Sequence, residues 1–192
     1  TSNMASWNYE FYSRLEKFKN VEIQMSLDGA GSVGEFIRFP SDLNKVKENI
    51  MKAVGLASTR PNWKVKCYTV LQALNYRHLL PIWEILREAA DTHSKHIDWW
   101  PITLYSPPQL SLGAISMEQR MTFLKEFKLL AAEFNSKVSY FRINDSTMSP
   151  CIDSIKNPEF SEELHNQLHQ YVKILDKSRK TNGYELFKTE LS

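Results

Sequence analysis

Apolar and polar positions along the chain follow helical spacing in some segments and strand-like runs in others. Between residues 6 and 19, apolar side chains recur every three to four positions, which predicts an amphipathic helix. The next segment, Val21–Ser26, is short and rich in strand-forming residues, and it stops at an Asp-Gly pair. That pattern predicts a strand running into a loop.

The rest of the chain repeats this alternation. Asp42 or Ser41 is placed to cap the next helix and Gly55 to end it. Pro101 has no backbone N–H to donate to the hydrogen-bond ladder of a central strand. The strand that contains it is therefore expected to bulge or to be shortened there. The polar tail, 177–192, is expected to be only partly ordered. The predicted elements are helices at 43–54, 79–91, 116–134 and 161–175, and strands at 64–71, 97–105 and 138–142.

Strands that alternate with helices form parallel sheets, because the chain must return to the same end before each new strand. We therefore expect an α/β fold, namely a partial parallel (β/α) barrel of TIM-barrel type with about four βα units. A closed eight-stranded barrel takes about 250 residues, and this chain has 192. N-terminal strands are thus expected to be missing. Residues 1–146 would form the barrel part and 147–192 a short C-terminal extension.

The composition of the chain argues against several classes of partner and scaffold. The 24 basic and 22 acidic residues give a net charge of +2, which argues against a nucleic-acid partner. Apolar runs fall far short of the roughly 20 residues that a membrane helix needs, so no membrane partner is expected. The two cysteines, Cys67 and Cys151, are too few for a disulfide scaffold. A cytoplasmic location is the expectation.

In parallel α/β proteins, ligands bind beyond the carboxyl ends of the strands. Ser26 and Asp28 leave the first strand as alternate residues, so both can face the same side. A hydroxyl beside a carboxylate suits a diol such as a ribose, and Gly29 and Gly31 would keep the site uncrowded. Asp-Gly is also a common turn dipeptide, and on spacing alone the turn is the favoured interpretation.

Three further segments follow predicted strands or flank them. Arg38 could clamp a carboxylate with two parallel hydrogen bonds, or pair with Glu35 at the surface. Asn75 could offer its amide to a ligand, or cap the next helix. The segment Tyr105–Pro108 could be an apolar ledge for a flat ring, or a stiff loop.

One pair of histidines has metal-ligand spacing. His165 and His169 lie four residues apart on a predicted helix. The pattern lacks a third ligand and the acidic residue of His-Glu-x-x-His, so we interpret it as an exposed polar helix face. No phosphate-cradling or dinucleotide-binding glycine motif is present.

Taken in order along the chain, the predicted elements and motifs resemble those of the radical S-adenosylmethionine enzymes. The resemblance is closest to the twitch-type members, which have a short C-terminal extension. Each motif is loose, and the specificity lies in their order and spacing over most of residues 1–187. The resemblance is carried by Val21–Gly29, Glu35–Arg38, Asp42–Ile50, Tyr68–Val70, Asn75, Leu80–Pro81, Ile174–Arg179 and Glu185–Phe187, and by Thr1–Asn3 as the start of a loop after an upstream strand.

The resemblance implies a parent enzyme that reductively cleaves S-adenosylmethionine at a [4Fe–4S] cluster. The resulting 5′-deoxyadenosyl radical would abstract hydrogen from a substrate. By the same resemblance, Ser26 and Asp28 would face the ribose, Arg38 the methionyl carboxylate, Asn75 the cofactor or substrate, and Tyr105–Pro108 the adenine.

The chain departs from the family at the cluster. The family's Cys-x-x-x-Cys-x-x-Cys loop is absent, and two distant cysteines cannot replace three thiolates. We therefore expect the C-terminal part of such an enzyme, inactive as it stands, with the cluster ligands upstream of Thr1.

Other interpretations remain open. One is a degenerate barrel that lost the cluster and serves as a binding or scaffold module. Another is an aldolase-like enzyme, but the predicted strand ends offer no lysine nucleophile. An incomplete barrel would expose the edge of Val21–Ser26, and self-association through that edge is expected.

Overall fold

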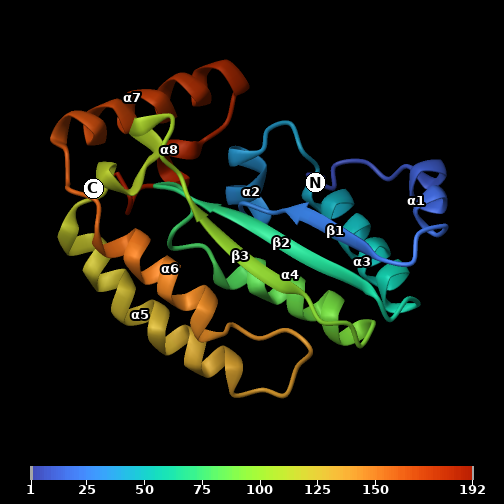
Figure 1. Ribbon diagram of the computed structural model, residues 1–192. Coiled ribbons are helices and arrows are strands. Elements are labelled where there is room, and N and C mark those ends of the chain that lie inside the picture. The colour runs from blue at the N-terminus through green and yellow to red at the C-terminus, as the bar shows by residue number, and fades with distance from the viewer. Residues whose placement is uncertain (1, 192) are drawn as a thin grey trace.

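The computed structural model describes residues 2–191 and shows an α/β fold around a small parallel sheet (Figure 1). Its strands are β1 (Val21–Ser26), β2 (Trp63–Leu71) and β3 (Asp98–Thr103), in the order β1-β2-β3. The α-helices are α1 (Tyr9–Leu15), α2 (Gly31–Ile37), α3 (Leu43–Ser58), α4 (Leu80–Thr92), α5 (Met117–Asn135), α6 (Asp145–Lys156), α7 (Glu162–Arg179) and α8 (Gly183–Leu186), with short 3₁₀ turns η1 (Pro108–Leu110) and η2 (Leu112–Ala114).

The predicted partial TIM-type barrel with four βα units is wrong. The described residues form three strands, not four, and the segment predicted as the fourth strand is a loop. Val138 is 93% exposed there, and of the apolar residues in this segment only Phe141 is buried. Helix α6, which the sequence analysis did not predict, packs against β3 instead. A side-chain hydrogen bond joins Thr103 of β3 to Ser154 of α6.

Pro101 neither shortens β3 nor creates a bulge. The Leu104 N–H bonds to Leu71 O, 3.0 Å away, so alternate residues of β3 direct their backbone groups toward β2. Pro101 lies between two of these residues, and its nitrogen therefore points away from β2, toward the outer edge of the sheet. A proline on an edge strand costs no ladder hydrogen bond in that orientation.

Local signals located several helix starts correctly. The Asp42 carboxylate caps α3 by accepting from the N–H groups of Asn44 and Lys45. Ser116 and Ser161 likewise cap α5 and α7. The prediction that Gly55 ends its helix is wrong, because α3 continues through Gly55 to Ser58.

Gly55 has a packing role instead. A Cβ at this position would lie 2.9 Å from the ring of His93, which is closer than side-chain carbons approach. The glycine therefore lets the end of α4 lie close to α3. Sequence alone cannot distinguish this requirement from a helix stop.

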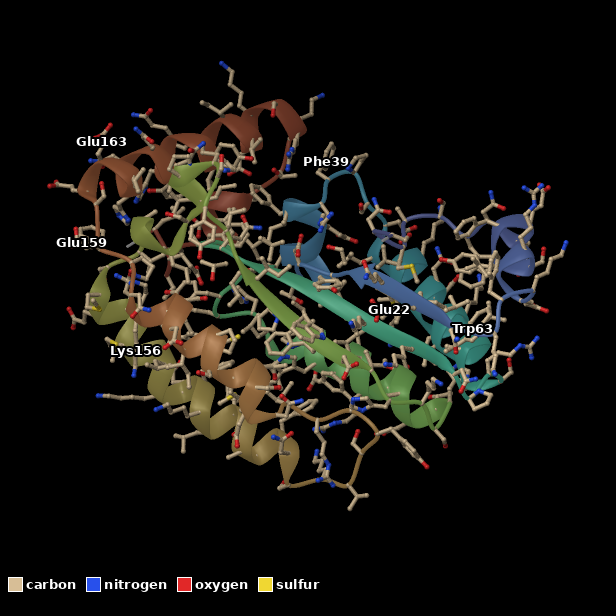
Figure 2. The ribbon with its side chains drawn as sticks, viewed as in Figure 1. Glu22, Phe39, Trp63, Lys156, Glu159 and Glu163 are labelled. Carbon is tan, nitrogen blue, oxygen red and sulfur yellow. The ribbon has the colours of Figure 1, made fainter. Side chains whose placement is uncertain are left out.

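One face of the sheet carries helices and the other does not. In Figure 1, α3 and α4 lie behind the strands, while no helix crosses the face turned toward the viewer. That face includes Glu22, labelled in Figure 2, whose carboxylate pairs with Lys66 at 2.8 Å. Trp100 and Ile102 are about half exposed on β3. Parallel sheets are usually covered on both faces, so this exposure is unusual.

The covered face holds the core. Trp83 of α4 contacts Trp99 of β3 edge to face, with ring centroids 5.4 Å apart, and also packs against Phe127 and Phe134. The Trp99 indole N–H donates to Thr69 Oγ1 at 2.8 Å, so this buried polar group is satisfied. No helix within residues 2–191 is long and apolar enough to cross a membrane.

The tail is more ordered than the sequence predicts. Phe187 is fully buried and Leu191 is 5% exposed, so the last residues pack into the core rather than fray. Asp176 organises the turn before them by accepting from Thr181, Gly183 and Tyr184. Arg179 Nη1 donates to Phe36 O at 2.7 Å and ties the end of α7 to α2.

Arg120 joins α5 to the segment that ends α6. It is completely buried and donates to three backbone carbonyls, those of Ile115 at 3.0 Å, Ile155 at 2.7 Å and Pro158 at 2.6 Å. The guanidinium therefore satisfies three backbone acceptors, two of them in fully buried hydrogen bonds.

Arg120→Ala is expected to lower the free energy of unfolding by about 3–5 kcal/mol, because it leaves buried carbonyls without donors and creates a void. Urea denaturation of the variant measures this loss. Lys125→Ala, on the exposed face of the same helix, should change stability by about 0.5 kcal/mol or less. Equal stability of the two variants would contradict the role assigned to Arg120.

Candidate functional site

The carboxyl ends of β1 and β2 are joined by a side chain. Leu27 N–H makes the last ladder bond, to Tyr68 O at 2.9 Å. Beyond it, the Asp28 carboxylate accepts the N–H of Val70 at 2.8 Å, so the side chain continues the pairing after the β1 backbone turns away. Asp28 is 4% exposed and is thus a buried carboxylate at the strand end.

Arg38, at the end of α2, compensates that charge. Its Nε donates to Asp28 Oδ2 at 2.7 Å, and its Nη2 donates to Ser26 Oγ at 2.6 Å. The structure therefore brings together three of the predicted site residues. The Arg38 side chain stays 34% exposed, and its Nη1 has no hydrogen-bond partner among the described residues.

Asn75 lies beside this cluster and is fully buried. Its amide nitrogen donates to Asp28 O at 2.8 Å and to Val70 O at 2.7 Å, while its amide oxygen accepts from Gln72 N at 2.9 Å. Both amide hydrogens are used to join the loops after β1 and β2. This geometry makes Asn75 a structural support of the site.

The loop after β1 also fits closely against α2. A Cβ at Gly29 would lie 2.7 Å from the Gly34 backbone, so glycine is required at this contact. The close approach lets Arg38 reach back to Asp28. It also places Phe36 and Ile37 of α2 at the carboxyl end of the sheet.

A cavity of about 220 Å³ opens at this edge, and we call it the strand-end pocket. Its polar groups are Asp28, Gln72 and Tyr171. The Gln72 side-chain amide and the Tyr171 hydroxyl have no hydrogen-bond partner within residues 2–191. Apolar side chains form the remaining walls, namely Phe36, Ile37, Val70, Leu74, Leu104, Pro107, Leu110 and Leu175.

The other two predicted residues lie apart from this pocket. Tyr105 is 82% exposed and lines a different hollow, of about 600 Å³, together with Asp153 of α6. Pro108 begins η1 and is exposed. Their neighbour Pro107 does line the strand-end pocket, so this loop contributes a wall through a different residue.

Several lining residues were not predicted as site residues. Gln72 directly follows β2, at the kind of strand end where ligands of parallel α/β proteins bind. Tyr171 and Leu175 come from α7, about a hundred residues farther along the chain. Their helical spacing indicated only an apolar face, and no local signal showed what that face would cover. In Figure 2, Glu163 marks the start of α7 and Phe39 the loop after α2.

The residues present do not fit an iron–sulfur cluster. Cys67 and Cys151 are both fully buried, in β2 and α6, and burial raises the pKa of each thiol far above its usual range. Cluster ligation needs thiolates. Within residues 2–191, no group of three or more histidine, cysteine or acidic side chains is arranged to hold a metal ion.

Comparison of the chain with protein-family models, with curated proteins and with solved structures found no match.

Asn75→Asp is expected to destabilise the protein by about 3 kcal/mol, because a carboxylate oxygen would face the two carbonyls that now receive amide hydrogens. Thermal or urea denaturation at pH 7 measures the loss. Asn166→Asp, at an exposed position of α7, is the matched control and should change stability by no more than about 0.5 kcal/mol. An Asn75→Asp protein of unchanged stability would refute the structural role.

Proposed function

We propose that this domain binds a small molecule with an adenine-like ring in the strand-end pocket. The observation that carries the proposal is Gln72, which lines a mainly apolar cavity at the carboxyl ends of parallel strands and whose side-chain amide has no hydrogen-bond partner within residues 2–191. This is the edge where ligands of parallel α/β folds bind. The cavity is smaller than a drug-sized site, so it suits one ring rather than a whole nucleotide.

The chemistry of the walls supports a flat heterocycle. A primary amide offers a donor and an acceptor side by side, which matches the N6 and N7 edge of adenine. Leu104, Pro107 and Leu175 supply apolar surface against which a ring can pack. The Tyr171 hydroxyl adds a further donor or acceptor.

S-adenosylmethionine is the ligand to test first, because the sequence resembles enzymes that use it. With the ring in the strand-end pocket, Asp28 lies at the pocket wall and Arg38 lies beside Asp28. The free Nη1 of Arg38 is the donor that we assign to the methionyl carboxylate. Asp28 already neutralises part of that guanidinium charge, so this contact adds specificity more than affinity.

A second candidate is that the parent protein is a radical S-adenosylmethionine enzyme with its cluster ligands upstream. One observation favours it. Ser2 pairs in parallel with Met25, through Ser2 N–H to Gln24 O and Ser26 N–H to Ser2 O, both at 2.9 Å. The chain therefore runs along the outer edge of β1, in the position of an additional parallel strand. The gene sequence before Thr1 tests the proposal, since absence of a cysteine triplet there would remove it.

Isothermal titration with S-adenosylmethionine and with adenosine tests the binding proposal. Gln72→Leu should weaken the binding of both ligands by about tenfold or more, because the ring edge loses two hydrogen bonds. Gln170→Leu, at an exposed position of α7, makes the same change away from the pocket and should leave affinity unchanged. Failure of the unmodified protein to bind either ligand would refute the proposal.

A further inference from the structure

A surface hollow of about 600 Å³ lies where the carboxyl end of β3 meets α6, and we call it the β3–α6 hollow. Its walls come from residues 103–105 at the end of β3, from the junction of η1 and η2, and from α6 with the two residues that follow it. In Figure 2, Lys156 and Glu159 mark the chain on either side of Asn157 and Pro158, which belong to the last of these walls.

Helix α6 and its C-cap present a polar face to this hollow. The face is formed by residues three or four positions apart, namely Pro150, Asp153, Ser154 and Asn157. Ser154 Oγ donates to Pro150 O at 2.7 Å and is also hydrogen-bonded to Thr103 Oγ1 of β3. The contact between α6 and β3 therefore uses Ser154 and leaves the other polar groups of this face unused.

Four polar side chains of the lining have no hydrogen-bond or ion-pair partner within residues 2–191, namely Tyr105, Ser111, Asp153 and Asn157. They come from three different segments and offer two hydroxyls, a carboxylate and a primary amide. The hydroxyls and the amide can donate and accept, whereas the carboxylate accepts only. This mixture matches a ligand rich in hydroxyl groups, because each hydroxyl of the ligand also donates and accepts.

Tyr105 adds an aromatic surface to these polar groups. It is 82% exposed and is the most exposed aromatic side chain among residues 2–191. The face of an aromatic ring carries partial negative charge, and the C–H groups of a sugar ring, polarised by their oxygens, pack favourably against it. One face of a pyranose ring presents such C–H groups, while its rim presents hydroxyls. The hollow offers a partner for each.

The charge of the lining favours an uncharged ligand. Among the described residues, the side chains that line the hollow include one carboxylate, that of Asp153, and no lysine, arginine or histidine. A phosphate or a carboxylate would be repelled by Asp153 and would find no cation to offset the repulsion. A single carboxylate also falls short of the ligand set that a bound metal ion needs.

The backbone of two walls is held in place without a ligand. Arg120 donates to Ile155 O at 2.7 Å and to Pro158 O at 2.6 Å, and these two carbonyls flank Asn157 along the chain. On the opposite wall, Ser111 N–H donates to Pro108 O at 2.9 Å. Binding therefore requires little ordering of the main chain, which lowers its entropic cost.

We propose that the β3–α6 hollow binds an uncharged sugar, with the C–H face of a pyranose ring on Tyr105 and its hydroxyls on Asp153 and Asn157. Residues four apart on a helix have Cβ atoms about 5–6 Å from each other, roughly the width of such a ring. The volume accommodates one or two sugar units. The inference does not rest on the function proposed above. Leu104 lines both this hollow and the strand-end pocket, so their two ligands would be neighbours.

Saturation-transfer NMR with the methyl α- and β-glycosides of glucose, galactose, mannose and xylose tests the proposal. At least one glycoside is expected to bind with a Kd of about 1 mM or lower. Its binding should shift the backbone amide signals of residues 104–112 and 150–158. No binding by any of these glycosides, or shifts confined to other segments, would overturn the proposal.

Two variants then locate the binding glycoside. Tyr105→Ala and Asp153→Ala should each weaken its binding by about tenfold or more. Both side chains are exposed and unpartnered, so their removal leaves the fold intact. Tyr140→Ala, at a tyrosine that is 52% exposed, and Asp145→Ala, in the first turn of α6, are the matched controls and should leave affinity unchanged. Unchanged affinity in both hollow variants, or an equal loss in the controls, would refute the site.

Adenosine distinguishes this site from the strand-end pocket. Excess adenosine should leave the affinity for the glycoside unchanged, because the two ligands occupy different cavities. Displacement of the glycoside by adenosine would assign both ligands to one site and overturn the proposal. Binding of the glycoside without binding of adenosine would refute only the function proposed above, and the reverse result would refute only the sugar site.

Discussion

The buried carboxylate of Asp28 is the interaction on which the carboxyl edge of the sheet depends. It receives the Val70 N–H after the β1 backbone has turned away, and Arg38 supplies the opposite charge. A buried charge without a partner costs several kcal/mol, so Asp28 is tolerated only where α2 delivers that arginine. The same constraint brings α2 close to the sheet and forms one wall of the strand-end pocket.

The rest of the architecture follows from the way this small sheet is covered. Helices α3 and α4 lie on one face, and α6 fills the position beside β3 where a further strand was predicted (Figure 1). The strand-end pocket lies at the carboxyl ends of the strands, where Tyr171 and Leu175 of α7 form part of its lining. The described residues therefore form an α/β domain around a three-stranded parallel sheet.

Sequence reasoning succeeded where the signal was local. The bounds of β1 and the helix starts at Asp42, Ser116 and Ser161 depend on residues within a few positions of one another. It failed where the outcome depended on distant partners. The segment at 138–142 has strand-like residues but an exposed Val138, and Pro150 inside α6 made that helix resemble a loop. Nothing near Tyr171 indicates that it reaches the end of β2.

Helix α7 holds one wall of the strand-end pocket in a fixed position. Leu168 and Val172 are fully buried along one stripe of the helix, which fixes α7 as a rigid body on η1 and η2. His165 and His169 lie on one side of that stripe, and Tyr171 and Leu175 reach the pocket from the other. A rigid helix cannot shift on the side of His165 and His169 without moving its pocket side. The wall that Tyr171 and Leu175 supply to the strand-end pocket is therefore as fixed as the buried stripe of α7.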